Sequence, residues 1–250
     1  MEIVTLNQTN LAKEHICCAI SDKKGENCVS SKKAWLQKQF DNGLVFKKFD
    51  VRGKVFIEYL PAEHAWYPID AAGYMHIDCF WVAGQYQGQG LASKLLDACI
   101  QDAKAKGKCG LTVLSSAKKQ PYLSDPNYLK YKGFQTADTA LPSYELLYLP
   151  FTEDAPVPSF RACAKRSEID EQGMVLYYTN QCPHTAKYVP LIAEIANKRG
   201  AALSIHKIET EEQAQNAPSP YTTYSFFYNG KLITHEIMSG KKFEKFLDTL

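Results

Sequence analysis

Short apolar runs that end at turn residues recur along the first 150 residues of the chain. They predict six strands, at residues 1–6, 44–49, 54–60, 74–82, 110–114 and 144–149. Apolar side chains at helical spacing predict four helices, at residues 10–20, 31–40, 91–106 and 127–132. The second and third strands are joined by the short segment 50–53, so we expect them to form a hairpin. The order of these elements predicts a mixed α/β (α+β) domain over residues 1–150.

The pattern changes after residue 150. Pro150, Pro156 and Pro158 cannot continue a helix or a central strand, so residues 151–172 are predicted to be a linker. A second set of elements follows, with strands at 174–178, 202–208, 224–228 and 232–237 and helices at 186–199 and 241–250. The last two strands flank Asn229-Gly230, which is a strong hairpin signal. Residues 173–250 are therefore predicted to form a smaller α/β domain.

Composition narrows the range of partners. The 250 residues include 29 basic and 27 acidic side chains, and a net charge of +2 creates no field that would attract nucleic acid or a membrane surface. No apolar run approaches the roughly 20 residues of a membrane span, and the polar start is unlike a signal peptide, so we expect a cytoplasmic protein. The eight cysteines lack metal-ligand spacing, so we expect free thiols and no metal site.

The segment between strand 74–82 and helix 91–106 reads Gln85-Tyr86-Gln87-Gly88-Gln89-Gly90. Two glycines allow the backbone to turn its N–H groups toward an anion, and the following helix adds the positive end of its dipole. A purely structural turn can use the same glycines. The segment lacks the first glycine of the dinucleotide fingerprint and the Lys-Ser/Thr of a Walker loop. Its position between strand and helix favours a phosphate-binding turn.

This Q/R-x-x-G-x-G/A segment and the order of elements around it resemble the GNAT N-acetyltransferase superfamily over residues 1 to about 150. The resemblance implies a mixed sheet with flanking helices, acetyl-CoA as co-substrate and an amine as acceptor. It also implies that the backbone of Asp78, Cys79 and Phe80 holds the pantetheine arm. The backbone amides that would hold the pyrophosphate are those of Tyr86, Gln87, Gly88, Gln89, Gly90 and Leu91.

The second domain begins with a strand followed by Cys182-Pro183-His184-Thr185, which opens a helix. This order resembles the thioredoxin fold, and a thiolate of Cys182 at a helix N-terminus would be favoured by the helix dipole. Thr185 stands where the resolving cysteine would be, and Thr222 stands where a proline would precede the hairpin. A monothiol or structural role is therefore favoured over oxidoreductase activity. The pair of domains resembles YoaP-type acetyltransferases.

In many GNAT enzymes, a tyrosine four residues before a Gly-Phe pair protonates the thiolate of CoA. Leu129 occupies that place here, before Gly133-Phe134. The neighbouring Tyr128 is the predicted acid, with Tyr122 and Tyr131 as alternatives. Tyr128 as a packed aromatic is an equally open interpretation.

A base for the acceptor amine is predicted from the strands that border the same cleft. Glu58 lies in an otherwise apolar strand and is the leading candidate, although an outward-facing Glu58 fits the pattern as well. Further candidates are Glu63, His64, His76 and Asp78.

These residues predict an N-acetyltransferase that acts on an amine of a small molecule or peptide. One alternative is a thiol-based redox or binding protein that uses Cys182 and senses CoA through the GNAT domain. A non-catalytic CoA-binding module is another, suggested by Leu129.

Overall fold

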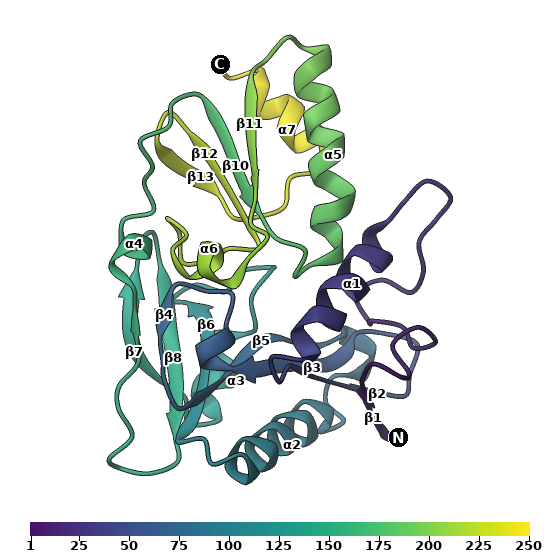
Figure 1. Cartoon of the computed structure of the whole chain (residues 1–250), viewed down its shortest axis with the longest axis vertical. Helices are drawn as coiled ribbons and strands as arrows, with labels where there is room; N and C mark the ends of the chain where they lie inside the picture. Colours follow the sequence, from purple (N-terminus) through teal and green to yellow (C-terminus); the bar gives the residue numbers. More distant parts are fainter.

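The computed structural model describes all residues, 1–250, and shows two units stacked along the long axis of the molecule (Figure 1). The N-terminal unit contains a seven-stranded sheet in the order β1-β2-β3-β5-β6-β8-β7. These strands are β1 (Ile3–Leu6), β2 (Val45–Phe49), β3 (Val55–Pro61), β5 (Tyr74–Val82), β6 (Gly110–Ser116), β7 (Gln135–Ala140) and β8 (Tyr144–Pro150). Only β5 and β6 pair in parallel, so the sheet is mixed.

Helices cover both faces of this sheet. Along β3, Val55, Ile57 and Tyr59 enter one core cluster with α2 (Leu91–Ala105) and α3 (Pro126–Tyr131). Phe56 and Leu60 enter another with α1 (Cys28–Phe40). The alternation of strand side chains thus places α1 and α2 on opposite faces. None of the helices combines the length and the apolar composition that crossing a membrane requires.

The sheet opens between its two parallel strands. β5 pairs with β6 only from Tyr74 to Ile77, and β5 then runs on to Val82 with β3 as its sole partner. Asp78 is an extra residue on β5, because Glu58 faces Cys79 while Tyr59 faces Ile77. Such a bulge bends the strand and changes which side chains face the core. Beyond Ile77, the edge of β5 toward β6 therefore has no ladder partner.

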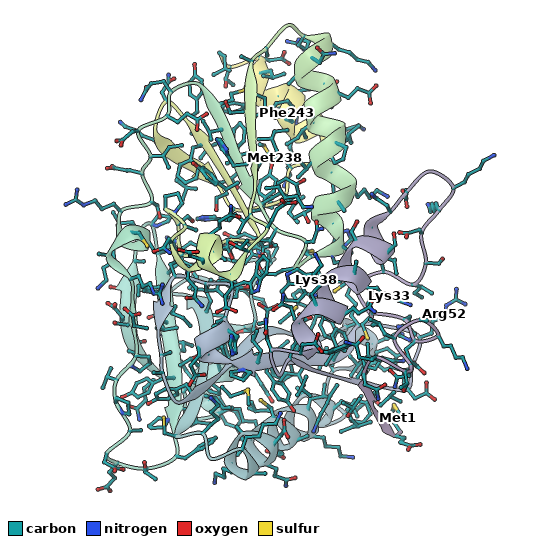
Figure 2. The ribbon with its side chains drawn as sticks, in the orientation of Figure 1. Met1, Lys33, Lys38, Arg52, Met238 and Phe243 are labelled. Atoms are coloured by element: carbon teal, nitrogen blue, oxygen red, sulfur yellow. The ribbon has the colours of Figure 1, made fainter.

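The C-terminal unit is a four-stranded sheet in the order β11-β10-β12-β13, with β10 and β11 parallel and the other pairs antiparallel. Its elements are β10 (Met174–Tyr178), α5 (Pro183–Lys198), β11 (Leu203–Lys207), α6 (Glu211–Gln215), β12 (Tyr224–Tyr228), β13 (Lys231–Thr234) and α7 (Gly240–Leu247). Met238 and Phe243, labelled in Figure 2, lie in its core. The strands, hairpin and two longer helices follow the predicted order, and a thioredoxin-like ancestry stays a prediction.

The two units share buried surface. Ile208 and Ala217 pack in the same cluster as Trp66 and Leu6, and Tyr221 packs with residues of the N-terminal unit. At the rim of this interface, Lys187 forms an ion pair with Glu26, and His64 is hydrogen-bonded to Glu211. Continuous cores of this kind hold the units in one arrangement.

The segment predicted as a linker is ordered on the N-terminal unit. It contributes β9 (Ser159–Phe160), which pairs with β4 (Ile69–Asp70), and the short α4 (Ala162–Lys165). Arg161 bonds Asp70 on one side and the side-chain oxygen of Gln215 on the other. The linker therefore ties the two units together.

One predicted helix is absent. Residues 10–20 form turns, because the side chains of Asn7 and Asn10 bond nearby backbone groups and Cys17 has a φ of +62°. Two apolar residues of this irregular segment, Leu11 and Ile16, are nevertheless buried. The sequence also did not predict β7, of whose residues only Ala140 is buried, the five-residue α6, or the short elements β4, β9 and α4.

Candidate active site

The glycine turn presents free backbone donors. After the 3-10 turn η2 (Gly84–Tyr86), Gly88 and Gly90 have φ values of +76° and +72°, which favour glycine. None of the six backbone N–H groups of residues 88–93 has an acceptor within the protein, and α2 begins without a side-chain cap. Such a run of donors at a helix N-terminus suits an anion.

This geometry corrects part of the predicted pyrophosphate set. The amides of Tyr86 and Gln87 donate to Ala83 and Gly84, so they close η2 and are not available to a ligand. Their side chains instead line the cavity next to the turn. The free donors extend past Leu91 to Ala92 and Ser93, which the sequence reasoning had omitted.

A cavity of about 480 Å³ adjoins the turn, and we call it the donor cavity. It is lined by the start of α2, the end of β5, the segment 119–125 and Tyr128. The Tyr128 hydroxyl is buried and has no hydrogen-bond partner, and its ring packs edge-on against Phe80 with centroids 5.9 Å apart. Burial raises the pKa of Tyr128, which keeps the phenol protonated.

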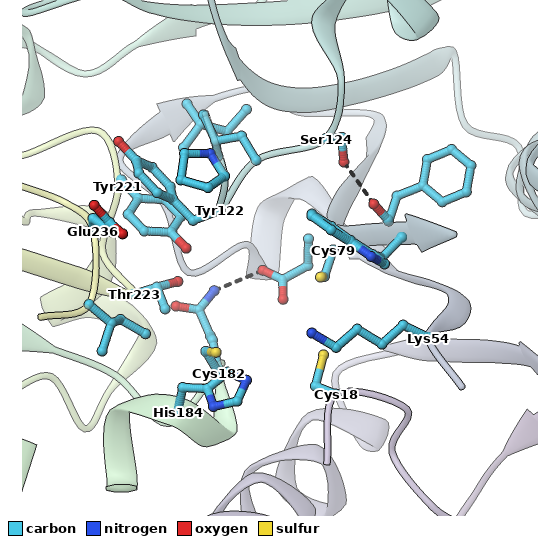
Figure 3. A pocket seen from close by; sticks show the side chains of 18 of the residues that line it. Cys18, Lys54, Cys79, Tyr122, Ser124, Cys182, His184, Tyr221, Thr223 and Glu236 are labelled. Atoms are coloured by element: carbon cyan, nitrogen blue, oxygen red, sulfur yellow. Dashed lines mark hydrogen bonds between the residues drawn. The ribbon is translucent and has the colours of Figure 1, made fainter. Parts of the chain in front are cut away.

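A second cavity, of about 420 Å³, lies between the two units, and we call it the acceptor cavity (Figure 3). Asp78, Cys79 and Trp81 line it from β5, while Gln181, Cys182 and Tyr221 line it from the C-terminal unit. The two cavities share Phe80, Trp81, Pro121, Leu123 and Ser124. They therefore meet at the open edge of β5. There the Ser124 hydroxyl donates a 3.1 Å hydrogen bond to the Phe80 carbonyl.

Asp78 is the carboxylate that β5 contributes to the acceptor-cavity wall, and the C-terminal unit fixes its position. The side-chain amide of Gln181 donates to Asp78 Oδ1 over 2.8 Å. The Gln181 oxygen in turn accepts from the Thr179 hydroxyl over 2.7 Å, and it lies 3.2 Å from the Thr222 hydroxyl, whose shorter hydrogen bond goes to the Trp66 carbonyl. These bonds orient the amide so that its NH₂ group faces Asp78. The sequence reasoning missed this role of Gln181.

Glu58 does not line the acceptor cavity. It is buried behind the strand and forms an ion pair with Lys32, with 2.6 Å between Nζ and Oε1. Burial raises the pKa of Glu58, and the nearby Asp78 acts in the same direction, while the Lys32 ammonium opposes both. Asp78 therefore lines this cavity, and the predicted Glu58 does not.

The other predicted bases are engaged elsewhere. His76 is fully buried beside Thr112, and burial lowers its pKa to about 4. Glu63 pairs with Lys108, and His64 pairs with Glu211. None of the three lines either cavity.

Comparison with known proteins identifies the chain. The model of the GNAT acetyltransferase family matches residues 19–121, and a YoaP-like model matches residues 203–245. An uncharacterized N-acetyltransferase of Bacillus subtilis (strain 168), YoaP, is 43% identical over 247 residues, which span 99% of this chain and 98% of that protein. The chain belongs to the GNAT acetyltransferase family. It is thus an acetyltransferase with acetyl-CoA as co-substrate, and the redox alternative is not favoured.

Solved GNAT structures also resemble the chain. YhbS from Escherichia coli in complex with CoA is 14% identical, with a TM-score of 0.42 over 64% of this chain and 89% of that one. A GNAT acetyltransferase from Brucella melitensis in complex with acetyl-CoA is 14% identical, with a TM-score of 0.39 over 64% of this chain and 96% of that one.

Within this GNAT enzyme, the three candidate tyrosines have different surroundings. Leu129 is buried in the core, whereas Tyr131 is 83% exposed. Tyr122 bonds Tyr144 in the acceptor cavity. Of the three, Tyr128 alone lines the donor cavity.

Cys182 caps α5 and lines the acceptor cavity of the GNAT enzyme. Burial raises the pKa of its thiol despite the nearby His184 amide, which is opposite to the shift that a reactive thiolate needs. No group of three or more His, Cys, Asp or Glu side chains has the geometry to hold a metal ion.

Proposed function

We propose that this GNAT enzyme transfers the acetyl group of acetyl-CoA to the amine of a small molecule held in the acceptor cavity. The observation that carries the proposal is the wall that the two cavities share at Phe80, Trp81 and Ser124. A thioester that enters from the donor cavity and an amine in the acceptor cavity meet at this wall. A volume of about 420 Å³ lies in the range of small-molecule sites, about 300–1,000 Å³.

In this proposal, the free amides of residues 88–93 bind the pyrophosphate of acetyl-CoA. The pantetheine arm lies along the unpaired edge of β5. There it replaces the Ser124 hydroxyl as the hydrogen-bond donor to the Phe80 carbonyl. Asp78 and Cys79 contribute their backbone at this edge, as the sequence predicted. We also propose that the enzyme acts in the cytoplasm, where acetyl-CoA is available.

In this mechanism, a base acts in the acceptor cavity and an acid acts in the donor cavity. The Asp78 carboxylate binds the acceptor ammonium and takes its proton, which frees the lone pair for attack on the thioester carbon. The new C–N bond forms as the C–S bond breaks. The Tyr128 hydroxyl then protonates the departing thiolate, so that CoA leaves as a thiol.

The domain division supports this assignment. We propose that residues 1–150 bind the donor, that residues 151–172 tie the units together, and that residues 173–250 close the acceptor cavity. Gln181, Cys182 and Tyr221 are wall residues contributed by the last segment.

The test is release of free CoA, measured with a thiol reagent, in the presence of a panel of small amines. Gly88→Glu places a carboxylate in the phosphate turn at a φ of +76° and should abolish release. Gly84→Ala is the matched control, because that glycine has an ordinary φ and open space around it. The proposal fails if no amine raises CoA release above hydrolysis. The donor site is misassigned if Gly88→Glu retains wild-type turnover.

A further inference from the structure

The acceptor cavity contains one cation without a protein partner. Lys54 Nζ forms no ion pair and no hydrogen bond, and it lies 5.8 Å from the centre of the Trp81 ring. His184, also on the wall, stays neutral because burial and Lys54 lower its pKa. Lys54 is therefore the free positive group of the cavity.

The two carboxylates that line the cavity, Asp78 and Glu236, differ in whether a ligand can bind them. Asp78 accepts from the neutral Gln181 amide and has no cation of its own on the wall. Glu236 is ion-paired with Lys242 over 2.5 Å, and its side chain is 45% exposed. Asp78 and Lys54 thus form the one pair of opposite charges that a ligand can engage.

The remaining wall is mostly apolar and aromatic. Tyr122 and Tyr221 pack together with ring centroids 5.2 Å apart, and Leu114 lies on the same wall. Figure 3 shows these tyrosines on the side of the pocket away from Lys54, and Asp78 also lines the cavity. Glu236 lies beside the two tyrosines, but its charge is paired with Lys242, so this side of the cavity offers a ligand mainly aromatic surface.

We propose that the acceptor is an amino acid with an aromatic or branched apolar side chain. Its ammonium binds Asp78, its carboxylate binds Lys54, and its side chain packs against Tyr122 and Tyr221. A plain amine would leave Lys54 unpaired in a largely apolar cavity, which is unfavourable. The carboxylate removes that cost and fixes the amine toward the shared wall. This inference rests on the proposed acetyl transfer and names its substrate class.

The test compares each amino acid with its decarboxylated amine. We measure kcat/KM for phenylalanine against phenethylamine, and for leucine against 3-methylbutylamine, in the wild type, Lys54→Met and Lys54→Arg. Wild type should prefer the amino acid, and Lys54→Met should lower kcat/KM for amino acids by about tenfold or more. The same variant should not lower kcat/KM for the two amines and should leave the KM for acetyl-CoA unchanged. Lys54→Arg should retain part of the preference, because it keeps the charge.

Three results would overturn the inference. Equal use of both members of each pair, with the same ratio in Lys54→Met, would leave an acetyltransferase with a different substrate class. A raised KM for acetyl-CoA in Lys54→Met, with the acceptor KM unchanged, would assign Lys54 to the donor. If neither class of compound raises CoA release but another amine of the panel does, the substrate class is wrong and the proposed function stands. If no amine raises it, both fail. Because Lys54 is half-buried next to the start of β3, its substitution could affect folding. Thermal unfolding of each variant checks that it folds.

Discussion

The side-chain amide of Gln181 and the carboxylate of Asp78 are joined by a 2.8 Å hydrogen bond, although 103 positions separate them in the sequence. One residue belongs to the loop before α5 and the other to the bulge in β5. The bond makes the C-terminal unit part of the acceptor wall. Gln181 is thus a positioning residue for Asp78.

Gln181→Ala should lower kcat/KM for the acceptor by about ten- to a hundredfold, because a hydrogen bond to a charged group is lost. The KM for acetyl-CoA should stay the same. Steady-state kinetics with each substrate varied in turn separates the two effects. Gln172→Ala is the control, since that exposed glutamine bonds only the Asp170 carbonyl. Unchanged acceptor kinetics in Gln181→Ala would remove Gln181 from the site.

Tyr128→Phe should lower kcat by about a hundredfold, because the leaving thiolate loses its proton donor. Stability should change little, since the buried hydroxyl has no partner to lose. The measurements are steady-state kinetics and thermal unfolding. Tyr131→Phe provides the matched exposed control. Wild-type kcat in Tyr128→Phe would show that another group protonates the thiolate.

His76 should make the protein less stable in mild acid. Its pKa is lowered to about 4 by burial, from an ordinary value of about 6.5, so only the unfolded chain takes up the proton between these values. The contribution is present above about pH 6.5 and is lost as the pH falls toward 4. From pH 7 to pH 5 it amounts to about 2 kcal/mol of unfolding free energy. Urea unfolding at both pH values should show a smaller loss in His76→Asn than in wild type. Equal losses would contradict a buried neutral His76.

Cys182 should be dispensable for acetyl transfer and slow to alkylate. Burial raises its pKa, so the midpoint of its alkylation against pH should lie above the roughly 8.5 of a free cysteine. Peptide mass spectrometry after timed iodoacetamide treatment gives this midpoint. Cys182→Ala should keep CoA release within a few-fold of wild type. A midpoint below 7 together with lost activity would restore a chemical role for the thiol.

Local chemistry explains which parts of the fold the sequence predicts. The strand at 74–82 has its predicted bounds, because a largely apolar run, interrupted by His76 and Asp78, lies between Gly73 and the glycine turn. Residues 10–20 carry apolar side chains at helical spacing, but asparagine side chains compete for the backbone and the segment stays irregular. The spacing of apolar residues alone does not show that asparagine side chains compete for the backbone hydrogen bonds of a helix.

The candidate site divides in the same way. The proposed phosphate turn depends on two glycines that are visible in the sequence, and the structure gives them left-handed φ values. The roles of Asp78 and Glu58 depend on a bulge, which shifts the facing of β5 by one residue. Lys54 and Gln181 acquire their roles only when two distant units meet. No local pattern encodes that contact.

The bulge at Asp78 also limits how this strand can vary among relatives. Before the bulge, the odd-numbered Met75 and Ile77 face α2. After it, the even-numbered Phe80 faces α2, because the bulge adds one residue to the strand. An insertion or deletion before Phe80 in this strand would move Phe80 and Trp81 each to the face of the sheet opposite the one it now occupies. Substitutions preserve the facing. Variation in this strand should therefore occur by substitution alone, while its length stays constant.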